Sequence, residues 1–322
     1  MAVYTKLTKE DVEEILSNYS IGSLREFKGI EEGIENTNYF LLVGSKKYIL
    51  TIYEKRVKEK DLPFFSTLMT SLNKAGFKCP IPIESNNKKT IIRYKNKNLM
   101  IVSFLEGTAK NILTPDDCNS IGQEVARMHE ITKNFKIQRD NNLSIGSWRN
   151  IFDQIKDRCV QIHKDLPLLI ESNLIDVEKN WPKDLPRGII HADLFSDNIF
   201  FKDNNFSGII DFYFSCNDFY ALEIAICFNA LCFDGPKNNL SFNVTKAINF
   251  MNGYSLNRKI NDEEKKYIKV LSQGSALRFL LTRVFDALNT VEGAIVKVKD
   301  PMEYLVRLEF HKNSKNFEDY FF

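Results

Sequence analysis

The chain has 322 residues and a formal net charge of +2, with 43% hydrophobic and 27% charged side chains. These values are ordinary for a globular protein with a large core, and they exclude an intrinsically disordered chain. So small a net charge gives no strong attraction to nucleic acid or to an anionic membrane surface, so neither is expected as a partner. The length favours two lobes over one.

The start of the chain predicts a helix, because residues 8–11 (Thr-Lys-Glu-Asp) have the pattern of a helix N-terminal cap. The first 14 residues do not contain the apolar core of a signal peptide. The longest apolar stretch, 221–233, is interrupted by Glu223 and Asn229 and is too short to span a bilayer. The six cysteines are scattered, which predicts reduced and mostly buried thiols. A cytoplasmic protein is therefore expected.

The first hundred residues show strand patterns separated by turns. Residues 27–42 predict two strands joined by a glycine-containing turn, and residues 47–53 predict a third strand. A helix is expected over residues 62–75, ended by Gly76. Further extended segments are expected around residues 80–82, 90–94 and 99–104. The expectation is a small, mostly antiparallel sheet with one helix.

After Thr114 apolar residues recur mainly at helical spacing. Long helical segments are predicted around residues 150–178 and 241–290, and strands only next to residues 191–211. The change of composition near residues 106–108 predicts a boundary between two domains. These are residues 1–105, as a nucleotide-binding N-lobe, and residues 106–322, as a catalytic and substrate-binding C-lobe, with the ligand expected between them.

The segment 191–198, His-Ala-Asp-Leu-Phe-Ser-Asp-Asn, carries the strongest chemical signal in the chain. Apolar strand patterns precede and follow it, and a third strand pattern ends at Asp211. Asp193 can accept a hydroxyl proton, while Asn198 and Asp211 offer hard oxygen ligands for Mg²⁺. Asp and Asn are also common turn residues, so the interpretation depends on Asp211 following at hairpin distance. The combination predicts phosphoryl transfer, with His191 expected to hold the loop through hydrogen bonds.

The turn between the first two predicted strands is a candidate cover for phosphate groups. Gly33 allows the backbone to approach phosphates closely, and Thr37 and Asn38 could donate hydrogen bonds to phosphate oxygens. A glycine-containing hairpin is more often only a hairpin, so this prediction depends on the motif at 191–211. Backbone groups from Ser103 to Leu105 are expected to be free to read an adenine edge.

The H-x-D-x-x-x-x-N pattern followed by Ile-Asp-Phe at 210–212 resembles the aminoglycoside-phosphotransferase and choline-kinase group. The longer strings at 48–57, 210–218 and 276–283 are closer still to the homoserine kinases of that group. The resemblance implies an α+β, two-lobed protein-kinase-like fold, with an antiparallel sheet in a β-rich N-lobe and a mainly helical C-lobe. It also implies ATP and Mg²⁺ as cofactors, and phosphorylation of the L-homoserine hydroxyl, a step of threonine biosynthesis.

The third predicted strand departs from the protein-kinase pattern. Thr51 stands at the nucleotide-binding position where such kinases place a lysine that pairs with the phosphates. Lys55 or Arg56 could substitute, although a surface-charge role suits either equally well. This departure leaves a catalytically weak nucleotide-binding module as an alternative, against which the predicted base and metal ligands are intact.

A free amino acid as substrate needs a cation for its carboxylate and an acid for its ammonium group, because unpaired buried charges are costly. Asp218 and Glu223 are candidates for binding the ammonium group, and Arg278 and Arg283 are candidates for the carboxylate. Each has a structural alternative, such as an ion pair between Arg283 and Asp286 or a link between helices made by Glu223.

Two other substrates of the same group can be weighed by charge and aromatic content. Residues 211–300 hold no surplus of acidic residues, which a polycationic aminoglycoside would require. The aromatic residues within 212–220 could form a cage for choline, so a choline-type substrate stays open as an alternative.

Overall fold

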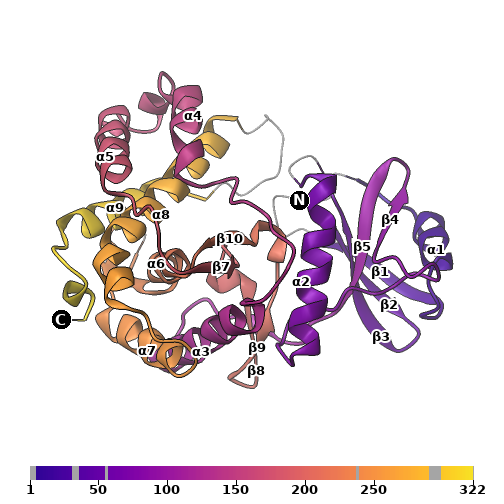
Figure 1. The fold of residues 1–322 in the computed structure, drawn as a ribbon. Helices are drawn as coiled ribbons and strands as arrows, with labels where there is room; N and C mark the ends of the chain where they lie inside the picture. Colours follow the sequence, from indigo (N-terminus) through magenta and orange to yellow (C-terminus); the bar gives the residue numbers. More distant parts are fainter. Residues whose placement is uncertain (1–4, 31–35, 55–56, 237–238, 290–298, 322) are drawn as a thin grey trace. The chain divides into compact units, whose positions relative to one another are not determined.

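The structure is a computed structural model that describes residues 5–30, 36–54, 57–236, 239–289 and 299–321 (Figure 1). The described residues form two compact units. The first comprises those of Met1–Gly107 and Ser207–Tyr213, and the second those of Thr108–Phe206, Phe214–Val291 and Lys297–Phe322. None of the helices in these ranges combines the length and the apolar character needed to cross a membrane.

The first unit is built on a five-stranded antiparallel sheet with the order β1-β2-β3-β5-β4. Its strands are β1 (Leu24–Ile30), β2 (Thr37–Val43), β3 (Lys46–Ile52), β4 (Ile91–Tyr94) and β5 (Lys97–Ser103). Two helices belong to this unit, α1 (Lys9–Ser17) and α2 (Leu62–Lys74), with a short 3₁₀ turn η1 (Glu59–Asp61) before α2.

One face of this sheet is covered by α1. Val12 and Ile15 of α1 are fully buried and lie in one core cluster with Leu41 of β2 and Leu50 of β3. Every second residue of β2 is buried, as expected for a strand with one face against a core. The sheet and its helix therefore follow directly from the alternation in the sequence.

The helix ends of this unit agree with the sequence signals. The Thr8 side chain accepts a hydrogen bond from the Asp11 N–H at 3.2 Å, and Asp11 accepts one from the Thr8 N–H at 3.0 Å, which completes a capping box. At the end of α2, Gly76 has a φ of +75°, a conformation that suits glycine after a helix.

The second unit is mainly helical. Its helices are α3 (Pro115–Thr132), α4 (Ile145–Ile155), α5 (Leu166–Asn180), α6 (Tyr220–Leu231), α7 (Val244–Ser255), α8 (Asp262–Asn289) and α9 (Met302–Asn313). The 3₁₀ turns are η2 (Cys159–Gln161), η3 (Ser196–Asn198) and η5 (Glu318–Tyr320), and η4 (Phe212–Phe214) runs across the division between the units.

Short strands accompany these helices in three small sheets. β7 (Arg187–Ile190) pairs with β10 (Cys216–Phe219), and β11 (Phe233–Asp234) pairs with β12 (Ser241–Phe242). A third sheet has the order β6-β8-β9, formed by β6 (Thr108–Ala109), β8 (Ile199–Lys202) and β9 (Asn205–Ile209). The predicted α+β class, with an antiparallel sheet in one part and helices in the other, is confirmed.

Two predicted helical segments were wrong in extent. The segment at 150–178 is divided between α4 and α5, and the segment at 241–290 between α7 and α8. A proline in the first turn of α5 starts a new helix there. Before α8, the Asn261 side chain accepts a hydrogen bond from the Glu264 N–H at 2.8 Å, a local cap that restarts the helix.

Two glycines allow α3 and α7 to pack against each other backbone to backbone. A Cβ atom at Gly122 would lie 2.0 Å from the carbonyl oxygen of Phe250, and one at Gly253 would lie 1.9 Å from that of Asn119. No side chain fits at such distances, so this helix pair requires glycine at both positions.

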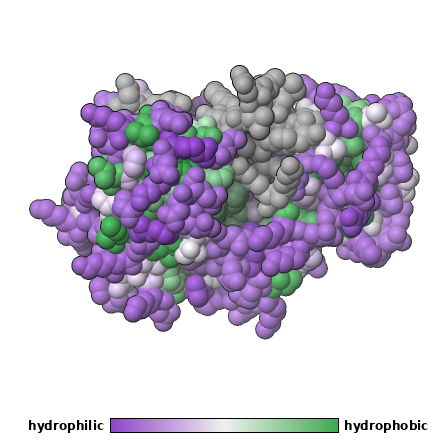
Figure 2. All heavy atoms as spheres, turned by 90° about the horizontal axis from the view of Figure 1, so that it is seen from above, coloured by the Kyte–Doolittle hydropathy of each residue, from purple (hydrophilic) through white to green (hydrophobic). Residues whose placement is uncertain are grey.

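The surface shown in Figure 2 is mostly hydrophilic, with hydrophobic residues in small separate groups. Large exposed hydrophobic side chains such as Ile112 and Leu168 are scattered along the chain, as on most soluble proteins. All six cysteines are free thiols and buried, which confirms that part of the sequence prediction.

Candidate active site

The loop at 191–198 lies between β7 and β8 in the second unit and is closed by its own backbone. The Phe195 N–H donates to the Asp193 carbonyl at 3.0 Å, and the Asn198 N–H donates to the Phe195 carbonyl at 3.0 Å. The side-chain Nδ2 of Asn198 also donates to the Asp193 carbonyl at 2.9 Å and lies 3.4 Å from Asp193 Oδ2. The predicted base and the first predicted metal ligand are therefore brought together in one turn.

Glu223, on α6, holds the beginning of this loop. Its carboxylate accepts hydrogen bonds from the His191 N–H and from the Ala192 N–H, the latter at 3.2 Å to each oxygen. The side chain is fully buried. Burial raises the pKa of Glu223 to about 7, although the two backbone N–H groups and the charge of Arg278 favour the ionised form.

Arg278, on α8, binds the carbonyl group of the same residue, Ala192. Its Nη1 donates to the Ala192 carbonyl at 2.6 Å, and its guanidinium lies 4.3 Å from the centre of the Phe279 ring. Ala192 has a φ of +66°, a left-handed conformation that is uncommon for residues with a side chain. Two buried charged groups thus maintain an unfavourable backbone conformation immediately before Asp193.

Asp211 follows β9 and belongs to the first unit, whereas Asp193 and Asn198 belong to the second. Its φ of +62° is also left-handed. Two residues further on, Tyr213 packs edge-on against Tyr53 and Phe65, with its ring centre 5.2 and 5.6 Å from theirs. The backbone of Asp211 is therefore anchored by aromatic packing in the first unit, and its role as a metal ligand stays a prediction.

The side chain of Asn198 fits the chemistry of a magnesium ligand. Because its Nδ2 is directed at the Asp193 carbonyl, its Oδ1 points away from that hydrogen bond and offers a hard oxygen. No group of three or more His, Cys, Asp and Glu side chains suited to a metal occurs in the described ranges. Magnesium is commonly held by one or two protein oxygens together with phosphate oxygens and water, so Asn198 suits that mode of binding.

The strand residues predicted to contact phosphate lie together at one end of β2 and β3. Asn38 is paired with Thr51 across the two strands, and the Thr51 Oγ1 donates to the Asn38 Oδ1 at 2.8 Å. Thr37 is fully buried, and its Oγ1 donates to Glu54 at 2.8 Å and accepts from the Thr5 N–H at 3.1 Å. These side chains are bonded to one another and to their neighbours, and a role in nucleotide binding stays a prediction.

Two N–H groups of the backbone expected to read adenine are used by the fold, which corrects the prediction for those two N–H groups; for the carbonyl groups it stays a prediction. The Ser103 N–H donates to the Ile81 carbonyl at 2.8 Å, and the Phe104 N–H donates to the Lys47 carbonyl at 3.2 Å. Both amides lie within the expected extended segment 99–104 and are bonded to neighbouring segments of the chain. The Leu105 N–H has no hydrogen-bond partner among the described residues, so it is the amide that suits the predicted role.

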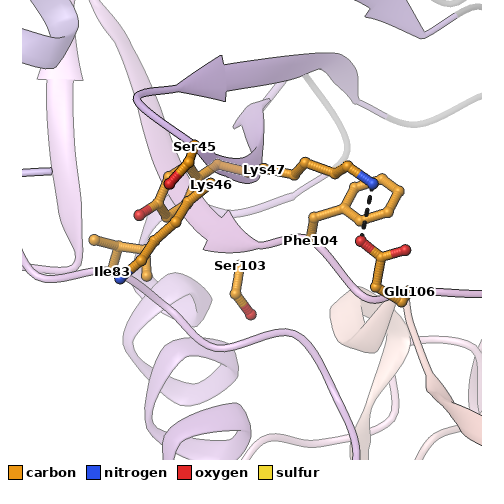
Figure 3. Close-up of a pocket in the computed structure, with 8 residues that line it drawn as sticks. Ser45, Lys46, Lys47, Ile83, Ser103, Phe104 and Glu106 are labelled. Atoms are coloured by element: carbon orange, nitrogen blue, oxygen red, sulfur yellow. Dashed lines mark hydrogen bonds and ion pairs between the residues drawn. The ribbon is translucent and has the colours of Figure 1, made fainter. Parts of the chain in front are cut away.

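A hollow of about 410 Å³ borders this segment within the first unit (Figure 3). Lys47 extends across the ring of Phe104, with its Nζ 5.3 Å from the ring centre and 3.0 Å from Glu106 (Figure 3). Both charged side chains are about half exposed, so the pair contributes at most ~1 kcal/mol. The predicted residues Gly33, Lys55 and Arg56 lie outside the described residues.

Two of the predicted substrate residues are already bonded within the fold of the second unit. Asp218 accepts hydrogen bonds from Asn141 Nδ2 at 2.7 Å and from a backbone N–H at 2.8 Å. Arg283 forms an ion pair with Glu303 at 3.0 Å and donates to the Asp300 carbonyl at 2.8 Å. Their roles in binding substrate stay predictions, and so does that of Glu223.

Arg139 is a structurally important residue that the sequence did not indicate. Its Nη1 donates to the carbonyls of Phe214 at 3.3 Å and Ser215 at 2.8 Å, and so holds the segment that leads into β10. These partners are 75 and 76 residues away in the chain. Arg139 stands in no motif, so spacing along the sequence could not reveal the contact.

The aromatic residues considered for a choline cage contact different partners. Tyr213 packs against Tyr53 and Phe65 in the first unit. In the second unit the Tyr220 ring lies 4.5 Å from the His129 ring, and the Arg258 guanidinium lies 4.6 Å from its centre. A protein cation already occupies the position over Tyr220 that a choline ligand would take.

A strand–loop–strand element that brings an aspartate and an asparagine together, followed by a strand ending in a second aspartate, is characteristic of enzymes that transfer phosphoryl groups. Within that class, the chain belongs to the phosphotransferase enzyme family, whose sequence model matches residues 26–240. The matched range includes the whole of the loop at 191–198 and Asp211.

Curated relatives are similar to the chain over nearly its whole length. The homoserine kinase of Beijerinckia indica subsp. indica is 43% identical over 312 residues, which cover 97% of this chain and 96% of that protein. The homoserine kinase of Bradyrhizobium diazoefficiens is also 43% identical, over 321 residues that cover 99% of this chain and 97% of that protein.

Solved structures of distant sequence share the fold. The amicoumacin kinase hAmiN, in complex with AMP-PNP, Ca²⁺ and Ami, is 11% identical and superposes with a TM-score of 0.70 over 97% of this chain and 95% of its own. A choline kinase from Cryptosporidium parvum is 17% identical, with a TM-score of 0.69 over 95% of this chain and 94% of its own. These structures have the protein-kinase-like fold expected from the sequence.

Proposed function

We propose that the protein is an ATP-dependent homoserine kinase, which transfers the γ-phosphoryl group to the side-chain hydroxyl of L-homoserine and forms O-phospho-L-homoserine. This reaction is a step of threonine biosynthesis. The observation that carries the proposal is the 41–43% identity with homoserine kinases over 97–99% of the chain. A small-molecule substrate and a cytoplasmic location, without nucleic acid or membrane as partner, complete the proposal.

Asp193 is the proposed catalytic residue. Its carboxylate accepts a hydrogen bond from the substrate hydroxyl, aims the oxygen at the γ-phosphorus and receives the proton as the new phosphorus–oxygen bond forms. In a loose transition state its orienting role exceeds its role as a base, because little negative charge is needed on the attacking oxygen early in the reaction. Asn198 supports this by holding the Asp193 carbonyl through its Nδ2.

Asn198 and Asp211 are the proposed ligands for Mg²⁺. Bound together with ATP, the ion would supply positive charge that offsets the negative charge developing during transfer. The protein's own contribution is to fix these two oxygens, through the hydrogen bond of Asn198 to the loop and through the aromatic packing next to Asp211.

A substrate panel tests the proposed function directly. Purified protein with ATP and Mg²⁺ is assayed for ADP release on L-homoserine, choline, methylthioribose and kanamycin, with each product identified by mass spectrometry. We expect turnover of L-homoserine to exceed that of the other three by orders of magnitude. Turnover of choline or kanamycin alone would refute the proposed substrate, and turnover of none would favour a nucleotide-binding module.

A further inference from the structure

Arg278 is the buried cation of the second unit for which the described residues supply no carboxylate partner. It is 5% exposed. The other two buried cations each have such a partner, because Lys246 lies 2.5 Å from Asp234 and Arg307 lies 3.9 Å from Glu303. A buried charge without an ion pair is costly, and burial lowers the pKa of Arg278 from its ordinary value. An anionic group placed beside Arg278 would therefore be strongly stabilised.

The unused hydrogen-bond donors of Arg278 lie on one edge of its guanidinium. Nη1 is occupied by the Ala192 carbonyl at 2.6 Å. Nε is buried without a hydrogen-bond partner, and Nη2 has none among the described residues. The N–H bonds of Nε and Nη2 point in the same direction, so together they form the fork that matches the two oxygens of a carboxylate.

A second unpartnered donor belongs to the same cluster. The hydroxyl of Tyr304, on α9, is fully buried and has no hydrogen-bond partner in the part of the chain that the structure describes. The Tyr304 ring lies 5.1 Å from the ring of Phe279, and the Phe279 ring lies 4.3 Å from the Arg278 guanidinium. Buried polar atoms in native proteins are rarely without partners, so two such groups in one cluster indicate a ligand.

This cluster is adjacent to the proposed catalytic base. Among the charged groups around Arg278, the carboxylate of Asp193 has the strongest electrostatic effect on the pKa of the guanidinium. Asp193 also acts on the pKa of Tyr304. In homoserine three carbon atoms separate the carboxylate carbon from the hydroxyl oxygen. One end of such a molecule can reach Arg278 while the other reaches Asp193.

We propose that the Nε–Nη2 edge of Arg278, together with the Tyr304 hydroxyl of the same cluster, binds the α-carboxylate of the amino-acid substrate. The inference rests on the proposed function and specifies the substrate class as a 2-amino acid with a terminal hydroxyl. Because Nη1 of the same guanidinium holds the Ala192 carbonyl, carboxylate binding also steadies the peptide that precedes Asp193. Recognition of the carboxylate and placement of the base are thereby linked through one side chain.

The test compares two ligands that each carry half of homoserine. L-2-aminobutyrate keeps the carboxylate and has no hydroxyl, and 3-aminopropan-1-ol keeps the hydroxyl and has no carboxylate. For Arg278→Gln we expect kcat/KM for L-homoserine to fall by about 10²-fold or more, the usual consequence of removing one partner of a buried charge pair. The inhibition constant of L-2-aminobutyrate should rise by a similar factor, while that of 3-aminopropan-1-ol and the KM for ATP change less than about threefold.

Two further variants separate recognition from loop positioning. Arg278→Lys keeps the charge but not the fork, so its effect on L-2-aminobutyrate should be intermediate. Arg127→Gln, a partly exposed arginine of α3 paired with Glu124, is the matched control and should leave every constant unchanged. A fall in kcat with an unchanged inhibition constant for L-2-aminobutyrate would overturn the proposal, because Arg278 would then only position the loop.

If a variant does not fold, the wild-type protein still allows a test of the proposed carboxylate site. In a crystal structure of the wild-type protein with L-homoserine and a non-hydrolysable ATP analogue, the carboxylate should lie within hydrogen-bond distance of Arg278 Nε or Nη2. A carboxylate bound by Arg139, Arg283 or Lys299 instead would refute the proposal. The protein could also bind L-2-aminobutyrate through Arg278 and yet not phosphorylate homoserine. That result would refute the proposed function but not the proposed carboxylate site.

Discussion

The loop at 191–198 and the strand ends at Thr37, Asn38 and Thr51 are both predicted to contact ATP or substrate, yet they are held in different ways. In the loop, buried charges from two other helices hold the backbone, through Glu223 and Arg278. At the strand ends the polar side chains are bonded to one another and to their neighbours. In the loop, the backbone carries the bonds to the rest of the fold, so side chains such as that of Asp193 are available for catalysis. At the strand ends, the polar side chains themselves form the bonds that stabilise the fold.

The largest effect is expected from Asp193→Asn. The amide cannot accept the hydroxyl proton, so kcat should fall by at least ~10²-fold while the KM for ATP changes little. Asp197→Asn is the matched control, because Asp197 stands in the same loop but is exposed and paired with Lys299 at 2.9 Å. Steady-state kinetics on L-homoserine measure both, and near-normal turnover by Asp193→Asn would refute its assignment as the base.

A smaller effect, dependent on pH, is expected from Glu223→Gln. The pKa of Glu223 is about 7 in the folded protein and 4.5 in the ordinary reference state, since burial penalises the charged form. The stability contributed by its neutral form is fully present below pH 4.5 and is lost as the pH rises through about 7. Glutamine does not titrate. The free energy of unfolding of the variant relative to that of the wild type should therefore increase between pH 4.5 and about 7, by at most about 1.4 kcal/mol per pH unit.

Urea unfolding of both proteins at pH 4.5, 6, 7 and 8 measures this difference. The variant should also lose activity, because an amide offers one acceptor oxygen to the two backbone N–H groups that Glu223 binds. Parallel stability curves for the two proteins would contradict the buried, partly neutral state of Glu223.

The smallest effect on activity is expected at the strand ends, from Thr37→Val. Valine has the same shape but no hydroxyl, so Glu54 and the Thr5 N–H each lose a hydrogen bond, at a cost of about 1–3 kcal/mol in unfolding free energy. The KM for ATP should change less than about threefold if the hydroxyl serves the fold. Thr70→Val, which removes one local bond within α2, is the control and should cost less.

The opposite result for Thr37→Val would support the original sequence interpretation. A large rise in the KM for ATP with unchanged stability would mean that the Thr37 hydroxyl binds phosphate. The difference between the loop and the strand ends would then no longer hold.

The sequence predicted those features that depend on neighbouring residues. The cap at Thr8 and the turn that joins Asp193 to Asn198 involve residues at most five positions apart. The groups that hold the loop could not be predicted in that way, because Glu223 and Arg278 are 31 and 86 residues from Ala192. Both were predicted as substrate residues from their charge, and only the fold showed that both bind the loop backbone.

The same distinction explains the errors within the first unit. The pattern at 99–104 predicts an extended segment, but nothing near Ser103 in the chain indicates that its N–H would be bonded to the Ile81 carbonyl. Thr37 and Glu54 are 17 residues apart, and their hydrogen bond depends on how β2 and β3 are aligned. Residue type predicted polar groups at this place, and the alignment of the strands determined what they bind.

Ala192 has a left-handed backbone conformation, and at this position thermal stability and catalytic rate are expected to favour different residues. Glycine adopts such a conformation without steric penalty, so Ala192→Gly would relieve about 1 kcal/mol of conformational energy in the folded state. It would also give the peptide before Asp193 more freedom to move. Directed evolution for thermal resistance alone should therefore select glycine here, whereas selection for speed should retain alanine.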